Sequence, residues 1–383
     1  MSIFHALRPA GDRIRFGNVG VPESAFPEGS KVTYFDSGTS ALAAAVGRAV
    51  ESHSSDSPEI LMPAYACPDL VSATVHAGAR ARLVELAENR PWMDMAALEK
   101  SLGPNSAGVI AVNFLGISER LEEIRPLLRE RGIPLIYDCA QSFEDGCKAA
   151  AETTILSFGR GKPVSLLGGG AVLDQGGVGA IGEWTKAGEA GARGPGIRFH
   201  VKARLYNMLA RPRWYWLVER LPMLGLGSTV YKPLAAVRPA PPAVRACLAA
   251  NVSAHARRSL SVQRQIAKMI RDLDQTSFQD LTAICGIDPA ARLLRFPILC
   301  LTRRAREDAV TALGEAGLGA SRLYGETLPH VEGVPENALV GERAFPRAES
   351  FASRLLTLPT HEDVTPRDVV RMEAVLREVA GRR

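Results

Sequence analysis

The sequence is poor in the features that mark membrane-spanning, exported and metal-binding proteins. Its 383 residues contain no run of eighteen apolar side chains, so we expect no membrane-spanning helix. The opening stretch MSIFHALRPAGDRIRF lacks the apolar core of a secretory signal, which predicts a protein that is not exported. The seven histidines show neither HxxxH nor HExxH spacing, and we therefore expect no metal site.

Cysteines are few, and none belongs to a CxxC pair. An even number of cysteines is weak evidence for disulfides in a chain of this length, and reduced thiols in the cytoplasm are the better expectation. We therefore predict a cytoplasmic protein. The six residues are Cys67, Cys139, Cys147, Cys247, Cys285 and Cys300.

Charge is almost balanced. The 46 Lys and Arg against 41 Asp and Glu give a net charge of +5, which suits an anionic substrate or surface. This excess is too small to indicate nucleic acid, and no nucleic-acid-binding module is recognisable. With 46% apolar and 23% charged residues, the composition is that of an ordinary globular protein long enough for two domains.

The first half of the chain, from about residue 33 to 180, alternates between helical and short apolar stretches. This alternation predicts a large α/β domain around a mainly parallel sheet, with its site at the carboxyl ends of the strands. Helices are expected over 40–52, 67–78, 93–103 and 121–132, and strands over 59–65, 81–86, 107–116, 133–140 and 153–159.

The alternation of helical and strand-like stretches stops in the segment 190–245, which is rich in Arg, aromatic residues, Gly and Pro. Pro212 and Pro222 are expected to interrupt any long helix there. We therefore predict a large domain over 1–245, with 190–245 as a basic aromatic excursion. A smaller α+β domain is predicted over 246–383.

Residues 198–232 combine positive charge with large apolar side chains. Seven basic residues and one acidic residue, Glu219, give a local excess of +6, and Trp214, Tyr215 and Trp216 lie among them. Such a segment can lie on an anionic membrane surface, bind a pyrophosphate or form a dimer interface. The sequence leaves these alternatives open.

Polar side chains follow two neighbouring strands of the predicted sheet. In IPLIYDCAQSF, Asp138 ends a strand and Gln141 follows; in TTILSFGRGK, Ser157 ends the next strand and Lys162 follows. Asp and Gln are also common in strand-end turns. A carboxylate and a lysine at adjacent strand ends are nevertheless what pyridoxal phosphate needs. The lysine forms a Schiff base, and the carboxylate keeps the pyridine nitrogen protonated.

A phosphate-binding stretch would complete such a site. DSGTSAL places Ser37, Gly38 and Thr39 directly before a helix, whose N-terminal N–H groups favour an anion. Taken alone, the stretch also fits an ordinary helix cap. Glycines 168–170, after the lysine, would either allow close backbone approach or form a plain turn.

Several motifs occur in the order of a known family. The chain resembles the DegT/DnrJ/EryC1/StrS family of pyridoxal-phosphate-dependent sugar aminotransferases, which have the fold-type-I, aspartate aminotransferase-like architecture. The five-residue step from Ser157 to Lys162 is that family's spacing between phosphate-binding serine and Schiff-base lysine. The similar stretches are SGTSAL, MPAYACPDLVSATVHAGA, VIAVNFLG, DCAQS, SFGRGK and LLTLPTH.

The resemblance implies a role for each matching residue. Lys162 would hold the cofactor and move a proton during the reaction, and Asp138 would pair with the pyridine nitrogen. Gln141 would lie near the phenolic oxygen of the ring. The phosphate would be bound by Gly38, Thr39 and Ser157.

Three stretches depart from the family pattern. At the place of the aromatic residue that covers the cofactor ring stands Cys67, with Tyr65 nearby, and both are candidates. The G-x-N-x-R stretch that reaches the phosphate of the partner subunit is absent, and VRPAPPAVRACLAA offers only Arg238 and Arg245. The turn EDGCKAAAET is shorter than the family's loop, which predicts an altered substrate pocket.

The resemblance implies a homodimeric aminotransferase that moves an amino group from glutamate to a keto-sugar, carried on a nucleotide, in polysaccharide or related sugar synthesis. Tyr324, Arg322 and His330 are candidates for substrate contact, although a lone histidine is more often structural. One alternative keeps the cofactor but acts on a non-sugar or lipid-linked ketone, or catalyses another reaction. The other is a non-catalytic protein that binds the cofactor.

Overall fold

The strands of the large domain are short and come mostly from the first half of the chain. The computed structural model describes residues 5–17, 26, 30–144, 153–174, 196–220, 229–273 and 277–381. The strands are β1 (Lys31–Phe35), β2 (Glu59–Pro63), β3 (Arg80–Val84), β4 (Ser106–Val112), β5 (Leu135–Asp138), β6 (Thr153–Ser157), β7 (Gly170–Asp174) and β10 (Leu339–Val340).

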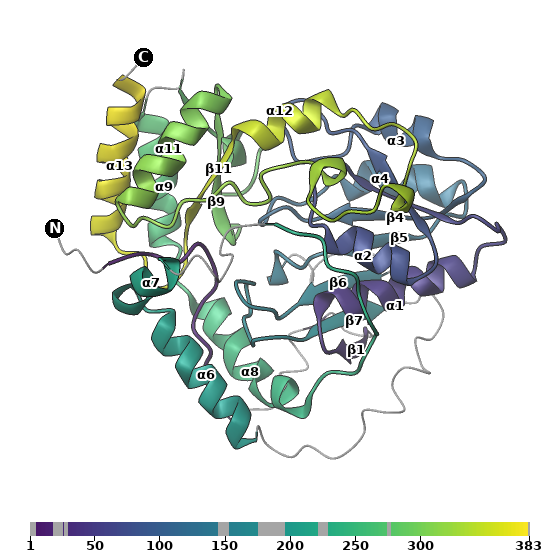
Figure 1. Cartoon of the computed structure of the whole chain (residues 1–383), viewed down its shortest axis with the longest axis horizontal. Coiled ribbons are helices and arrows are strands. Elements are labelled where there is room, and N and C mark those ends of the chain that lie inside the picture. The colour runs from purple at the N-terminus through teal and green to yellow at the C-terminus, as the bar shows by residue number, and fades with distance from the viewer. Residues whose placement is uncertain are drawn as a thin grey trace.

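Within the described residues these strands form one sheet in the order β1-β7-β6-β5-β4-β2-β3-β10 (Figure 1). Neighbours from β6 to β10 are parallel, whereas β7 runs antiparallel to both β6 and β1. This confirms the expected α/β domain with a mainly parallel sheet. The antiparallel edge brings β1 and β7 together just before the first helix.

Helices cover both faces of the sheet, because its central strands are apolar on both sides. Successive side chains of a strand point to opposite faces. In β4, Ile110 packs in the core under α1 and α2, whereas Val109 and Ala111 pack in the core with α3, α4 and α8. These helices are α1 (Gly38–Glu51), α2 (Asp69–His76), α3 (Met95–Ser101), α4 (Leu121–Arg129) and α8 (Pro242–Arg257).

A smaller lobe is built around the three-stranded antiparallel sheet β11-β9-β8. Its own apolar core includes residues of α9, α11 and α13, which lie together in Figure 1. The elements of this lobe are α9 (Ser261–Asp272), β8 (Phe278–Asp280), β9 (Arg295–Cys300), α11 (Arg303–Glu315), β11 (Leu355–Pro359) and α13 (Pro366–Gly381). The other elements of this part of the chain bury apolar side chains in the core of the large domain: α10 (Leu281–Ile284), η3 (Leu328–His330), η4 (Glu336–Ala338) and α12 (Pro346–Arg354).

The change from one core to the other comes after α8. Cys247, Leu248 and Val252 of this helix pack in the core of the large sheet, whereas Ile266 of α9 packs in the core of the lobe. Residue 245, where the sequence predicts the boundary, therefore lies inside a helix of the large domain.

Two further helices, α6 (Ile197–Leu209) and α7 (Pro212–Glu219), lie along the N-terminal segment 5–17. The side chain of Asn207 accepts the N–H of Ile14 and donates to its carbonyl, both at 2.8 Å. Pro212 separates the two helices as predicted and occupies the start of α7, where its missing N–H costs nothing. Pro222 lies outside the described residues.

Other expectations concern thiols, metals and membranes. In the described ranges Cys67, Cys139, Cys247, Cys285 and Cys300 are free thiols. Cys147 lies outside these ranges. No group of three or more His, Cys, Asp or Glu in the same ranges is placed to hold a metal ion. Among the helices the structure describes, none has both the length and the apolarity needed to cross a bilayer.

Candidate active site

The polar residues that follow two strands in the sequence meet at one edge of the sheet. Asp138 is the last residue of β5 and Ser157 is the last residue of β6, and these strands are parallel neighbours. The loop after β6 turns at Gly161, which has a φ of +74°, and Lys162 follows directly. The fold thus brings a carboxylate, a hydroxyl and an amine together, where parallel sheets commonly place their sites.

Asp138 is a buried carboxylate whose loss of hydration is only partly offset by hydrogen bonds and nearby positive charge. Only 7% of the residue is exposed, and one carboxylate oxygen accepts the N–H of Ala140 at 2.9 Å. Burial raises the pKa of Asp138, and the Ala140 N–H and the positive charge of Lys162 only partly offset the rise. A cation placed against this carboxylate, such as a protonated ring nitrogen, would therefore be stabilised.

The N-terminus of α1 lies beside the end of β6. Ser37 caps the helix, since its side chain accepts the N–H of Ser40 at 3.0 Å. A Cβ at Gly38 would lie 2.6 Å from the Cβ of Ser157, so glycine is required for this approach. The start of α1 and the side chain of Ser157 therefore lie against each other, and N–H groups of a helix N-terminus beside a hydroxyl suit a phosphate.

Glycine also brings β7 against this helix start. A Cβ at Gly170 would lie 2.5 Å from the carbonyl oxygen of Ser37. Gly169, with a φ of +99°, has a backbone conformation that other residues rarely adopt. Of the two roles expected for glycines 168–170, Gly170 serves close backbone approach.

A second carboxylate, that of Asp69, lies beside the start of α1. The hydroxyl of Thr39 donates to the carboxylate of Asp69 at 3.0 Å. Asp69 is exposed and opens α2, where an acidic residue is ordinary because it favours the helix dipole. For that reason the sequence carried no signal for its position beside Thr39.

Gln141 connects the two lobes. Its Oε1 accepts the N–H of Leu115 at 2.9 Å, and its Nε2 donates a short hydrogen bond to the hydroxyl of Tyr324. Tyr324 belongs to the segment between α11 and η3. Withdrawal from water raises the pKa of Tyr324 well above its ordinary value, and neighbouring Cys67 and Asp138 add to the rise. A neutral phenol from the smaller lobe thus lies at the mouth of the site.

The structure separates the two residues expected at the ring face. Tyr65 is 2% exposed, and its ring packs against those of Tyr324 and Phe351 with 5.5 Å between centroids in each case. Withdrawal from water raises the pKa of Cys67 to about 12, and the positive charge of Lys162 opposes this rise. Of the two candidates, Cys67 is the one whose electrostatics place it near the lysine.

Arg322 and His330 lie near Tyr324 in the sequence, and both are exposed. Nε of Arg322 donates to Glu307 at 2.9 Å, and Nδ1 of His330 lies 3.0 Å from the hydroxyl of Thr327. In the described part of the chain, neither side chain has a hydrogen bond to the residues at the strand ends. Any contact with substrate would require the ion pair of Arg322 to open.

The two arginines in the place of the missing family motif differ in position. The carbonyl of Arg238 accepts the N–H of Asp36 at 2.9 Å, so its backbone lies next to the start of α1, and its side chain is exposed. The guanidinium of Arg245 lies over the ring of Tyr34, 5.4 Å from its centroid. The shortened turn EDGCKAAAET lies almost wholly outside the described residues.

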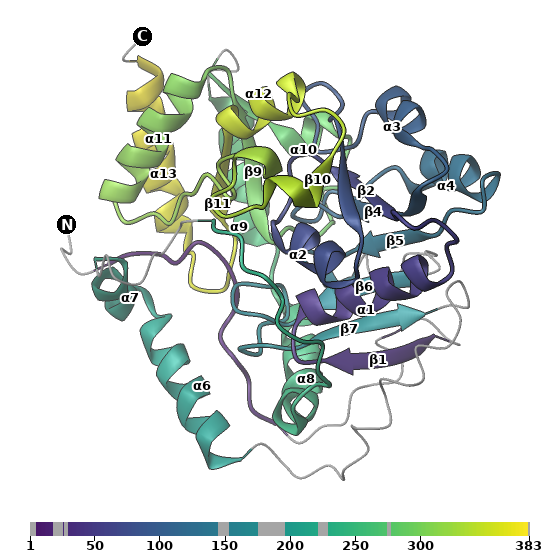
Figure 2. The same ribbon diagram turned by 45° about the vertical axis from the view of Figure 1, so that its right-hand side comes forward.

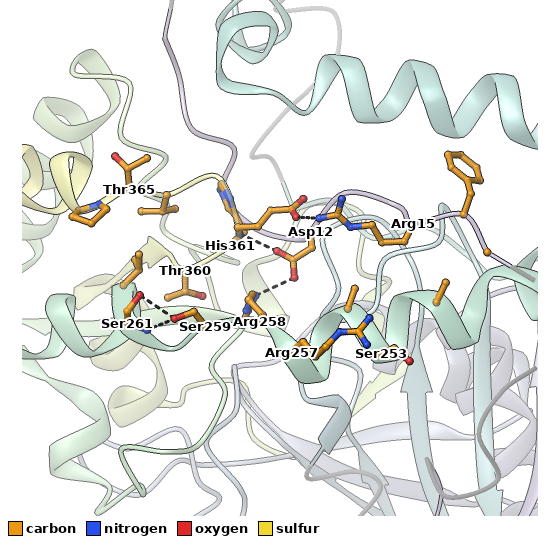
Figure 3. Close-up of a pocket in the computed structure, with 18 residues that line it drawn as sticks. Asp12, Arg15, Ser253, Arg257, Arg258, Ser259, Ser261, Thr360, His361 and Thr365 are labelled. Carbon is orange, nitrogen blue, oxygen red and sulfur yellow. Dashed lines mark hydrogen bonds and ion pairs between the residues drawn. The ribbon is translucent and has the colours of Figure 1, made fainter. Parts of the chain in front are cut away.

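A cavity of about 920 Å³ lies elsewhere, between the N-terminal segment, the end of α8, the start of α9 and residues 360–366 (Figure 3). Two ion pairs line it, Arg258 with Asp12 at 3.3 Å and Arg15 with Glu362, whereas Arg257 is exposed and forms no ion pair with the described residues. None of the predicted site residues lines it. We therefore assign it no part in the chemistry.

The functional groups of the site can be compared with those of a candidate cofactor. Lys162 supplies an amine, Asp138 a buried carboxylate that lacks a strong cationic partner, and the start of α1 an anion-binding turn that requires Gly38. These fit the aldehyde, the ring nitrogen and the phosphate of pyridoxal phosphate. A mainly parallel sheet with these groups at its carboxyl edge defines the fold-type-I class of pyridoxal-phosphate-dependent enzymes.

Within this class, the chain belongs to the DegT/DnrJ/EryC1/StrS aminotransferase family, which it matches over residues 24–177 and 246–377. This confirms the family and the pyridoxal phosphate cofactor expected from the motifs. The match leaves out residues 178–245, which contain α6 and α7.

Curated relatives match only over short stretches. Protein MosB of Rhizobium meliloti is 34% identical over 83 residues, which are 22% of this chain and 16% of MosB. A UDP-N-acetyl-3-dehydro-α-D-glucosamine 3-aminotransferase of Acidithiobacillus ferrooxidans is 29% identical over 106 residues, 28% of each chain. The matching stretches thus span less than a third of these relatives.

Solved structures match over nearly the whole chain. DesV of S. venezuelae, in complex with a ketimine intermediate, has a TM-score of 0.66 and 19% identity, covering 91% of this chain and 84% of DesV. PseC of Helicobacter pylori, an aminotransferase of pseudoaminic acid biosynthesis, has a TM-score of 0.64 and 15% identity, covering 92% and 87%. At such identities the likeness establishes the fold.

Proposed function

We propose that this protein transfers an amino group from glutamate to the keto group of a sugar carried on a nucleotide. The observation that supports it most is the buried carboxylate of Asp138, which lies within the electrostatic influence of Lys162 and at the same sheet edge as the close approach of Gly38 to Ser157. Pyridoxal phosphate, when bound, supplies a ring that accepts electrons from a substrate carbanion. One relative is named for a UDP-N-acetyl-3-dehydro-glucosamine substrate and one solved structure for pseudoaminic acid biosynthesis, which favours a sugar acceptor.

Each site residue has a defined task in this proposal. Lys162 binds the cofactor through its amine and then serves as the base that carries the proton. Asp138 keeps the ring nitrogen protonated, because a positive charge on that nitrogen stabilises the buried carboxylate of Asp138. Gln141, whose Oε1 is held by Leu115 and whose Nε2 donates to Tyr324, would offer the second N–H of that nitrogen to the phenolic oxygen of the ring. Cys67 covers the ring face in place of the family's aromatic side chain.

The substrate side of the site comes from the smaller lobe. Tyr324 contacts Gln141 directly, so its hydroxyl would lie beside the acceptor. Arg322 is held by Glu307 and is available to an anionic group once that pair opens. His330 would lie further out, at the entrance.

We also propose a cytoplasmic homodimer that works in polysaccharide or related sugar synthesis, with peripheral membrane contact through residues 198–232. The exposed side chain of Arg238 next to the start of α1 is where a second subunit would approach the phosphate. Sedimentation equilibrium should give twice the chain mass of 41.1 kDa. A value of one chain mass at micromolar concentration would contradict the dimer.

The spectrum of the protein tests the proposed reaction directly. The purified protein with pyridoxal phosphate should absorb near 400 nm, at the edge of the visible range. Adding glutamate should bleach this band, and a keto acid should restore it, since the donor half of the reaction is reversible. A band that neither glutamate nor another amino donor bleaches would leave a cofactor-binding protein without amino transfer.

Asp69→Asn is expected to tighten binding of pyridoxal phosphate about 5- to 10-fold at low salt. The carboxylate of Asp69 holds the Thr39 hydroxyl that the phosphate needs, and its charge repels a phosphate dianion. Because Asp69 is exposed, the gain should shrink at high ionic strength. Titrations of the cofactor by absorbance at 50 and 500 mM NaCl measure the effect.

Glu51→Gln is the matched control for Asp69→Asn, because it removes one exposed negative charge from the other end of α1. Its cofactor affinity should equal that of the parent protein. Weaker binding in Asp69→Asn would instead mean that the carboxylate supports the phosphate, for example by holding a cation from the partner subunit.

A further inference from the structure

The outer face of α6 carries a row of exposed apolar side chains. Ile197, Val201, Leu205 and Met208 are spaced four, four and three residues apart, which places them on one side of the helix. They are between 41% and 83% exposed, and the next helix, α7, exposes Trp214 and Leu217, each 44% exposed. We call these six residues the α6–α7 stripe. Exposed apolar side chains gathered on neighbouring helices in this way mark an interaction surface.

Contacts with the N-terminal segment 5–17 hold α6 and α7 against the rest of the protein. The N–H of Ala6 donates to the carbonyl of Pro212 at 3.0 Å, and Arg8 donates to the carbonyl of Ala210 at 2.7 Å. The rings of Phe16 and His200 lie 5.0 Å apart. Figures 1 and 2 show both helices along the outer edge of the molecule, away from the large sheet. The stripe is therefore presented outward on a fixed support.

Positive charge surrounds the stripe. Between residues 196 and 220 there are six basic side chains and one acidic side chain, which together equal the net charge of +5 of the whole chain. Within the described ranges none of the six forms an ion pair. All are exposed: Arg198, Lys202, Arg204, Arg211, Arg213 and Arg220.

We propose that α6 and α7 dock the protein on the surface of an anionic lipid bilayer. The stripe would enter the interface between headgroups and acyl chains, and the surrounding cations would contact lipid phosphates. Trp214 has the amphipathic side chain that favours this depth. The segment lies in the part of the chain that the family match leaves out, so the shared aminotransferase chemistry does not account for it.

A second copy of the chain is a poorer occupant of this surface. A two-fold contact through α6 and α7 would set the six cations of one subunit against the same six of its partner. An anionic bilayer satisfies both the apolar stripe and the charge. This inference does not depend on the proposed reaction, because vesicle binding is measured without substrates.

Cosedimentation with vesicles tests the proposal in the full-length protein. The parent should bind vesicles of phosphatidylcholine with 30% phosphatidylglycerol at low salt, and should not bind vesicles of phosphatidylcholine alone. Arg198→Gln/Lys202→Gln should bind the anionic vesicles about 30-fold more weakly, which corresponds to about 1 kcal/mol for each basic side chain lost. Val201→Ser/Leu205→Ser should also lose binding, and its loss should persist at any salt concentration.

Arg264→Gln/Lys268→Gln is the matched control, because it removes two exposed cations at the same spacing from α9 in the other lobe. It should bind as the parent does, and melting curves should show that all variants are folded. The proposal is overturned if the parent ignores anionic vesicles, or if the control loses as much binding as the α6 pair. It is also overturned if Val201→Ser/Leu205→Ser lowers the oligomeric mass, since the stripe would then join subunits.

Discussion

Lys162→Ala is expected to slow the glutamate half-reaction by roughly 10⁵-fold or more. The substitution removes the amine that binds the cofactor and the base that moves the proton, and no other lysine is near in the described part of the site. The rate at which glutamate bleaches the absorbance of the holoprotein measures the loss. Reduction with borohydride should attach the cofactor covalently to the parent protein, at the peptide that contains Lys162, and should not do so in the variant.

Arg160→Ala provides the control for this change. Arg160 lies two residues before Lys162 in the same loop, is exposed, and carries the same charge. Its loss should leave both the covalent attachment and the bleaching rate within a few-fold of the parent. If Lys162→Ala still bleaches at the parent rate, or if borohydride attaches the cofactor to another lysine, Lys162 is not the residue that binds the cofactor.

The long elements of the large domain could be predicted from the sequence, because their apolar patterns extend over many residues. The helix at 38–51 and the buried strands at 106–112 and 135–138 fall where their periodicity places them. The edge strands β1 and β7 were not predicted. Each is five residues long and pairs with a neighbour far away in the sequence, so neither has a distinct local pattern.

The candidate site likewise has residues that could be predicted from the sequence and contacts that could not. Asp138, Ser157 and Lys162 could be proposed because each follows a recognisable strand, and the sheet then brings them together. The contact between Thr39 and Asp69 depends on how α1 and α2 pack, and the bond from Gln141 to Tyr324 joins residues 183 positions apart. Such contacts come from tertiary packing, which the local sequence does not specify.

Asp138→Asn is expected to slow the glutamate half-reaction about 10³-fold, because a neutral amide cannot hold the ring nitrogen protonated. The same change should make the cofactor-free protein more stable at neutral pH. Burial raises the pKa of Asp138, so the folded protein holds a proton at this site more strongly than the unfolded chain does. The parent therefore loses stability as the pH rises from the unfolded value of 3.8 through the raised pKa. An amide removes that loss, which is about 1–3 kcal/mol for an underpaired buried group.

Glu119→Gln is the control that separates the effect of a buried carboxylate on stability from its effect on the glutamate half-reaction. Burial raises the pKa of Glu119 to about 7, although its carboxylate accepts the N–H groups of Met93 and Arg120 at 3.0 Å each. Glu119→Gln should therefore flatten the fall in stability between pH 4.5 and 7 while the glutamate half-reaction keeps its rate. Urea unfolding of cofactor-free protein at pH 5 and pH 8 measures the stability of both variants. If Asp138→Asn is instead less stable than the parent at pH 8, the carboxylate already has a cationic partner in the cofactor-free protein. The uncompensated burial of Asp138 would then not explain why it binds a protonated ring nitrogen.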